Sequence, residues 1–210
     1  MDISRRTAGL GLLAYGIGTP LAFLSIGSPG GDYDDGMVTS YMSSSHWVTA
    51  FALAYLGAFA TLGLLPFAAR MRSELRSGGD LFLGLAVAGM AAGVIGWFLL
   101  GGLAVVFAEG GSALNSLPHT VVYALNELSL LVTVGAGSFL VGAAAVVLAA
   151  GAPLSAPLRV FTVVGGVCGL LAPFFFPLFV FWLWAIAFGV WTLASAARVS
   201  STVTAEHQPA

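Results

Sequence analysis

The chain has 210 residues, of which 59% are hydrophobic and only 8% are charged, and its mean hydropathy is +0.98. Soluble domains carry about 25% charged residues, so this composition excludes a water-soluble globular domain and predicts a protein embedded in a lipid bilayer. The formal net charge of −2 and the absence of lysine do not favour a nucleic-acid partner. The single cysteine, Cys168, excludes an intramolecular disulfide and a CxxC metal site.

Long apolar runs predict six transmembrane helices in one domain, 1–198. A helix that crosses the hydrocarbon needs about 20 apolar residues. The last run, 158–198, is twice that length, and we divide it at Pro173 and Pro177 because two prolines four residues apart do not fit one straight helix. The predicted spans are 8–26, 47–69, 81–107, 119–150, 158–174 and 178–197, followed by a disordered cytoplasmic tail, 199–210.

The distribution of charge orients these spans. With six spans and a cytoplasmic N-terminus, all seven arginines fall on the cytoplasmic side, whereas the external loops carry only Asp32, Asp34, Asp35 and Glu109. This asymmetry is what the positive-inside rule requires. The predicted fold is therefore all-α: a polytopic helical membrane bundle with both termini cytoplasmic. We expect a multi-pass protein of the plasma membrane, which in a bacterium is the inner membrane.

Small residues at helical spacing predict close packing between helices. In membrane helices such residues allow two backbones to approach each other. Two sets stand out, one in the first span and one in the third: Gly9, Gly11, Gly16 and Gly18, and then Gly84, Ala88, Ala92 and Gly96 with Gly89 and Gly93 beside them. We expect the third span to be central in the bundle, with its 84–96 stripe tightly packed.

The fourth span holds Glu127, the only charged residue well inside an apolar run. On a helical wheel His119, Tyr123 and Asn126 form a polar stripe, and Glu127 lies at its edge. A polar stripe in a membrane helix faces protein or water rather than lipid. Glu127 is eight residues past His119, which places it about 12 Å deeper in the membrane. Because no span contains an arginine or lysine, we expect its carboxyl group to be neutral or to face a wet cavity.

Two interpretations of Glu127 follow from the sequence. In the first, Asn126 and Glu127 join helices through hydrogen bonds to polar groups of neighbouring spans. The candidates for such bonds are Tyr15, Thr19, Tyr55 and Thr61. In the second, Glu127, Asn126, Tyr123 and His119 form a ligand or proton site in an outward-facing pocket.

The histidines at the ends of two spans form a second candidate site. His46 begins the second span and His119 the fourth, both at the external side of the predicted topology. Together with Glu109 or the loop that contains Asp32, they could bind Zn²⁺ or Cu²⁺, or they could ligate haem as an axial pair. Neither histidine has a second ligand at metal-binding spacing, so the sequence itself predicts no cofactor.

The sequence contains no recognisable catalytic motif, so it does not favour an enzyme and leaves the question of enzyme activity open. Three functions are compatible with a bundle of this kind. The favoured one is a carrier or binding protein for a small or lipophilic solute, with its pocket around Glu127. The second is a non-catalytic accessory or assembly subunit with a membrane-protein partner or a second copy of the chain. The third is a metal- or haem-binding redox subunit that uses His46 and His119.

Overall fold

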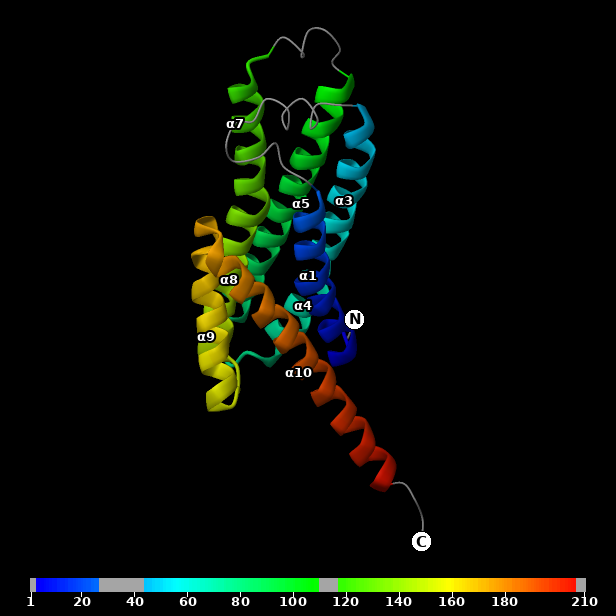
Figure 1. The fold of residues 1–210 in the computed structure, drawn as a ribbon. Coiled ribbons are helices and arrows are strands. Elements are labelled where there is room, and N and C mark those ends of the chain that lie inside the picture. Colours follow the sequence, from blue (N-terminus) through cyan, green and yellow to red (C-terminus); the bar gives the residue numbers. More distant parts are fainter. Residues whose placement is uncertain (1–2, 27–43, 110–116, 207–210) are drawn as a thin grey trace.

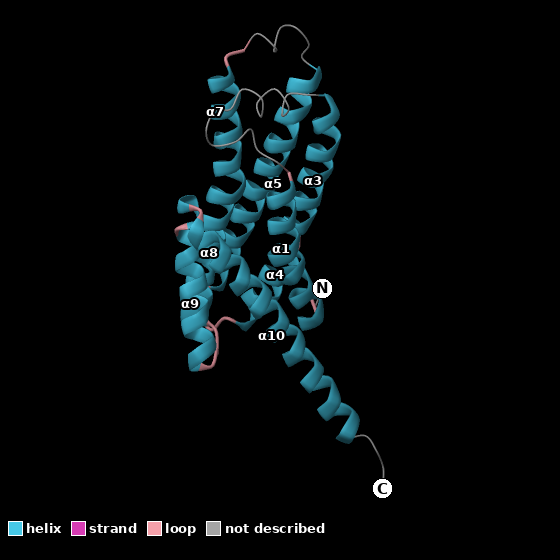
Figure 2. Cartoon of the chain, viewed as in Figure 1, coloured by secondary structure: helices cyan, strands magenta, loops and turns pink. Residues whose placement is uncertain are grey.

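The computed structural model describes residues 3–26, 44–109 and 117–206, and every secondary-structure element in these ranges is helical (Figures 1 and 2). The predicted all-α class is thus confirmed. The elements are α1 (Arg5–Ser25), α3 (Ser44–Leu62), α4 (Leu64–Glu74), α5 (Gly79–Glu109), α7 (His119–Leu130), a π-helical segment η1 (Leu131–Ala136), α8 (Gly137–Gly151), α9 (Ala156–Leu170), a 3-10 turn η2 (Ala172–Phe174) and α10 (Phe176–Glu206).

Within the described ranges, five helical segments are long and apolar enough to cross a membrane. They agree closely with five of the six predicted spans: Arg5–Ser25, His46–Glu74, Gly79–Phe107, His119–Gly151 and Phe176–Ala197. The remaining one, α9, has 15 residues, which correspond to about 22 Å, whereas the hydrocarbon is about 30 Å thick. The structure therefore has one apolar helix that is shorter than a typical span.

The predicted break between the last two helices is confirmed. α9 ends at Leu170, η2 contains Pro173, and α10 begins at Phe176. In Figure 1 this turn lies level with the junction of α7 and α8, well short of the ends of α3, α5 and α7. At its other end α10 remains helical to Glu206, beyond the predicted limit at 197, because no proline or glycine interrupts 190–206. The prediction of a disordered tail from residue 199 is therefore wrong up to Glu206, which is helical. Residues 207–210 lie outside the described residues.

The first helix is held between α10 and the α3–α4 pair by close backbone contacts. A Cβ atom built on Gly9 would lie 2.8 Å from the side chain of Leu193 in α10. On the opposite face Gly11 and Gly63 approach each other so closely that a Cβ on either one would meet the carbonyl oxygen of the other. The packing role predicted for the glycines of the first span is confirmed by these contacts.

Helix α5 is central, as expected, and packs against α3, α4, α7, η1 and α8. Its close-packed face differs from the predicted one. Gly89 and Gly96 are buried against α8 and η1, whereas Gly84 is exposed with nothing within 4 Å of a built Cβ, and Ala88 is exposed as well. The four-residue spacing of small residues occurs on both faces, and the position of the neighbouring helices decides which face is used.

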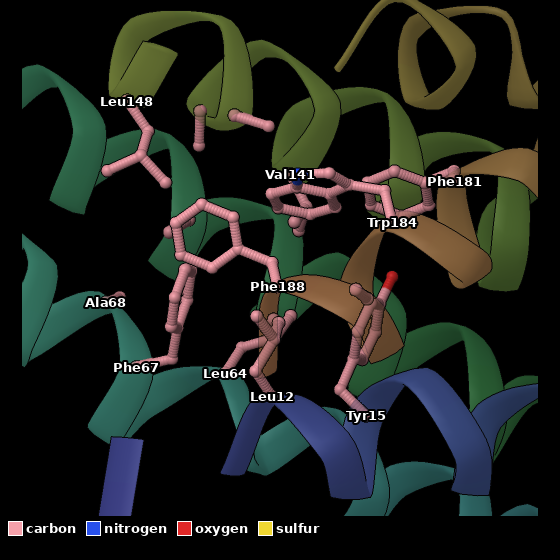
Figure 3. Packing of buried hydrophobic residues seen from close by; sticks show 14 of the residues in the cluster. Leu12, Tyr15, Leu64, Phe67, Ala68, Val141, Leu148, Phe181, Trp184 and Phe188 are labelled. Carbon is pink, nitrogen blue, oxygen red and sulfur yellow. The ribbon is translucent and has the colours of Figure 1, made fainter. Parts of the chain in front are cut away.

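Aromatic rings from α4 and α10 fill the centre of the bundle (Figure 3). The ring of Phe188 lies 5.8 Å from that of Phe67 and 5.8 Å from that of Trp184, and Leu12 of α1 is fully buried beside them. These contacts join the N-terminal helices to α10 over a long distance in sequence.

Ion pairs gather at one end of the bundle. The Nε atoms of Arg5 and Arg70 lie 2.8 and 2.9 Å from the same Oε1 of Glu74, and a guanidinium nitrogen of Arg72 lies 2.7 Å from Oδ1 of Asp80. The start of α1, the end of α4 and the start of α5 therefore meet at this end. The first turn of α7, which begins with His119, lies at the opposite end (Figure 1).

Candidate functional site

A cavity of about 540 Å³ lies where three parts of the chain meet. The end of α1 forms one side, the end of α7 with η1 forms the second, and the turn between α9 and α10 forms the third. The lining residues are Phe23, Leu24, Ile26, Glu127, Leu130, Leu131, Val134, Gly135, Ala172, Pro173 and Phe175. Among these side chains Glu127 is the only polar one.

The cavity follows from the short reach of α9. Helix α8 packs tightly on α9: the two backbones are so close that a Cβ built on Gly142 would lie 2.7 Å from the backbone of Gly169. On the other side of η1 from α8 lies α7, which packs against α5. The α9–α10 turn lies level with the α7–α8 junction (Figure 1). Helix α7 therefore extends past the α9–α10 turn (Figure 1).

The π-helical segment η1 begins four residues after Glu127, at Leu131. Leu131–Ala136 forms one π-helical stretch between two α-helices, and three of its residues, Leu131, Val134 and Gly135, line the cavity. Such interruptions are rare and are found frequently at functional sites, because the extra residue in the turn redirects the side chains that follow. Here the interruption separates the cavity-lining end of α7 from the tightly packed α8.

Glu127 is exposed to the cavity. Within the described ranges its carboxyl group forms no ion pair and no hydrogen bond. A hydrogen bond that joins helices in a membrane requires a partner on another helix, and the described residues supply none to Glu127. This geometry leaves the carboxyl oxygens available to a molecule in the cavity.

Two aromatic rings, those of Phe23 and Phe175, form the aromatic wall of the cavity. The ring of Phe23 lies 5.8 Å from that of Phe175 and 5.7 Å from that of Trp182. Phe175 also contacts Phe179, with ring centroids 5.3 Å apart. These rings come from α1 and from α10 with the turn before it, which are far apart in sequence and adjacent in the fold.

Phe175 has a strained backbone. It is the only described non-glycine residue with a positive φ, with φ and ψ at 68° and −61°. These values correspond to the rare form of γ-turn, which costs about 1–3 kcal/mol and persists only where the surroundings impose it. Its N–H donates to the carbonyl oxygen of Ala172 at 2.9 Å, and its own carbonyl accepts from the N–H of Leu178 at 3.0 Å. The strain places an aromatic side chain at the cavity, and strained residues of this kind cluster at ligand sites.

The structure separates the four residues predicted to form the site. Asn126 is fully buried in the face of α7 that also carries the buried Val122 and Ser129. Tyr123 and His119 are partly exposed and do not line the cavity, so only Glu127 does. Adjacent residues on a helix point about 100° apart, which is why Asn126 faces protein while Glu127 faces the cavity.

The polar side chains expected to bond to Glu127 are used elsewhere. Tyr15, Thr19 and Thr61 line a separate cavity of about 10 Å³ between α1, α3, α5 and α8, a volume at the lower limit for a single water. The indole N–H of Trp97 donates to Oγ1 of Thr61 at 3.1 Å, and the hydroxyl of Thr19 donates to the carbonyl of Tyr15 at 2.7 Å. This second cluster joins helices through hydrogen bonds.

Tyr15 and Ser138 are buried and line this same small cavity. The fourth expected partner, Tyr55, is partly exposed and packs edge-on against Phe51 and Phe98, with ring centroids 4.9 and 5.1 Å apart. None of the four expected partners therefore contacts the carboxyl group of Glu127 through a hydrogen bond in the described structure.

The histidines occupy the predicted positions, at the beginning of α3 for His46 and of α7 for His119. Across the described ranges no three His, Cys, Asp or Glu side chains lie close enough together to hold a metal ion. The loop that contains Asp32 lies outside the described residues, so the metal ligand predicted from this loop does too.

Sequence reasoning missed the aromatic and backbone components of the cavity. Phe23, Pro173 and Phe175 come from two distant segments, and only the fold shows that they meet Glu127. The available signal was the Pro-Phe-Phe-Phe-Pro break at 173–177, which placed a turn and three phenylalanines at one point. Comparisons with protein-family models, with curated proteins and with solved structures found no match.

Proposed function

We propose that the protein is a membrane-embedded binding protein or carrier for a small lipophilic solute, with the solute held in the cavity beside Glu127. The observation that supports this proposal is a cavity of about 540 Å³ whose described lining side chains are apolar except for one carboxyl group. Cavities of about 300–1,000 Å³ with a few polar groups in an apolar lining are typical of small-molecule sites.

In this proposal the short helix α9 counts as a sixth crossing, and both termini are cytoplasmic. The arginines at the end formed by α1, α4 and α5 support that orientation. With this end inside, the cavity lies in the outer half of the plasma membrane. Its lining includes the exposed side chains of Leu24, Leu131 and Phe175, so a solute enters from the surrounding lipid.

The residues of the cavity have distinct roles. The apolar lining takes up the body of the solute, and the rings of Phe23 and Phe175 contact its face. Glu127 orients the solute by accepting a hydrogen bond from it or by donating one to it, according to its protonation state. The buried cluster of Thr61, Trp97 and Tyr15 holds the helices together, which leaves Glu127 free of a packing role.

Binding of the neutral fluorophore N-phenyl-1-naphthylamine to the purified protein in a non-ionic detergent tests this proposal. Leu131→Trp places a larger side chain in the cavity lining, and Leu128→Trp makes the same change three residues earlier at an exposed position outside the lining. We expect saturable binding that Leu131→Trp weakens about tenfold or more, a change of about 1.4 kcal/mol, and that Leu128→Trp leaves unchanged. Equal binding by both variants, or no saturable binding, would contradict the proposal.

A further inference from the structure

The described lining of the cavity carries ionisable groups of one sign only, namely acidic. Among the described residues that line it, Glu127 on α7 is the only ionisable one. The segment of α1 that faces it contributes Phe23, Leu24 and Ile26, and the α9–α10 turn contributes Ala172, Pro173 and Phe175, all without charge. The described residues of these two walls therefore supply no cation to a carboxylate at Glu127, and beside them a positively charged molecule is stabilised in preference to a negative one.

The aromatic wall has the same preference. The faces of aromatic rings carry negative potential and attract cations within about 6 Å of the ring centroid. Phe23 and Phe175 line the cavity with ring centroids 5.8 Å apart, and both come from elements other than the one that carries Glu127. A cation in the cavity can thus be attracted both by the carboxylate of Glu127 and by the aromatic rings, while its apolar body contacts Leu24, Leu131 and Val134.

We propose that the solute is an amphiphilic organic cation, an amine or quaternary ion with an apolar body, and that Glu127 is its counter-ion. This inference rests on the proposed function, because it names the class of solute that occupies the same cavity. An anion of the same size meets only the carboxylate and the negative ring faces and is excluded. A neutral lipophile of similar size still fits the apolar lining.

Displacement of bound N-phenyl-1-naphthylamine by two nearly isosteric ions, tetraphenylphosphonium and tetraphenylborate, tests the inference. We expect the phosphonium ion to displace the fluorophore from the full-length protein at a concentration at least about tenfold lower than the borate ion. Glu127→Gln should remove this preference while retaining binding of the fluorophore, which also shows that the variant is folded. Glu109→Gln, which removes an exposed acid at the end of α5, should retain the preference.

The possible outcomes separate the two proposals. Fluorophore binding that depends on Leu131, without any preference for the phosphonium ion, would overturn the inference and leave the proposed function standing. A phosphonium preference that persists in Glu127→Gln would also overturn the inference, because it would show that the charge is recognised elsewhere. If the unaltered protein does not bind the fluorophore saturably, or if Leu131→Trp does not weaken that binding, the proposed function itself is overturned.

Discussion

Replacement of Glu127 by leucine should leave the stability of the protein unchanged. Its carboxyl group is exposed to the cavity and forms no hydrogen bond or ion pair within the described residues. Exposed substitutions that remove no contact change the free energy of unfolding by about 0.5 kcal/mol or less. Leucine also suits a lining that is otherwise apolar, so any change should be towards greater stability.

Thr61→Val provides the matched comparison. Valine has nearly the same shape as threonine but cannot accept the hydrogen bond that the Trp97 indole N–H donates to Thr61 Oγ1 at 3.1 Å. Both side chains are buried, with 2% and 1% exposed. A buried donor left without its acceptor costs about 1–3 kcal/mol, and measured hydrogen bonds between membrane helices average about 0.6 kcal/mol with a maximum near 1.7. We therefore expect Thr61→Val to lower the free energy of unfolding by about 1–2 kcal/mol.

Both variants can be measured by equilibrium unfolding in mixed micelles, with increasing dodecyl sulfate and with helicity followed by circular dichroism. The expected result is a transition for Glu127→Leu that coincides with that of the unaltered protein, and an earlier transition for Thr61→Val. A loss for Glu127→Leu as large as that for Thr61→Val would refute the reasoning. It would assign Glu127 to helix packing instead of ligand binding.

Three further predictions follow from the packing, the ion pairs and the orientation. Gly142→Ala places a methyl group 2.7 Å from the α9 backbone and should lower the free energy of unfolding by about 1–3 kcal/mol. In the same unfolding assay Gly84→Ala, whose methyl group meets nothing within 4 Å, should leave the free energy of unfolding unchanged or raise it by up to about 1 kcal/mol. Glu74→Gln removes a carboxylate shared by two arginines and should lower stability by about 1–2 kcal/mol in a salt-dependent manner; Asp80→Asn, at a pair whose acid is 86% exposed, should change it by less than about 0.5 kcal/mol. A topology reporter fused after Gly111 should be external, and a cytoplasmic signal would contradict the proposed orientation.

The long apolar helices were predictable because they depend on composition alone. A run of apolar residues long enough to cross the hydrocarbon must be helical, since no other regular structure of a single segment satisfies its backbone in lipid. The limits of His46–Glu74 and His119–Gly151 thus lie within five residues of those predicted. The break at Pro173 and Pro177 was equally local, because it follows from the restricted backbone of proline.

The arrangement around Glu127 was not predictable, because it depends on contacts between distant segments. The sequence marks Asn126 and Glu127 as adjacent polar residues but does not say which one faces the bundle. That choice is made by the packing of α7 on α5 and by the short reach of α9. The π-helical turn at Leu131–Ala136 has no recognisable sequence signal. Without the turn and the position of α9, the cavity and its aromatic wall could not be inferred.

Reaction with dicyclohexylcarbodiimide would test most directly whether Glu127 lies in a cavity that binds lipophilic molecules. This uncharged, lipophilic reagent adds covalently to protonated carboxyl groups that it reaches from an apolar environment, and mass spectrometry of the digested protein locates the adduct. We predict modification of Glu127, slowed by N-phenyl-1-naphthylamine and by tetraphenylphosphonium, with little modification of Glu74, which is bound by two arginines. An unmodified Glu127, or modification that neither compound slows, would contradict the assignment of this cavity as the binding site.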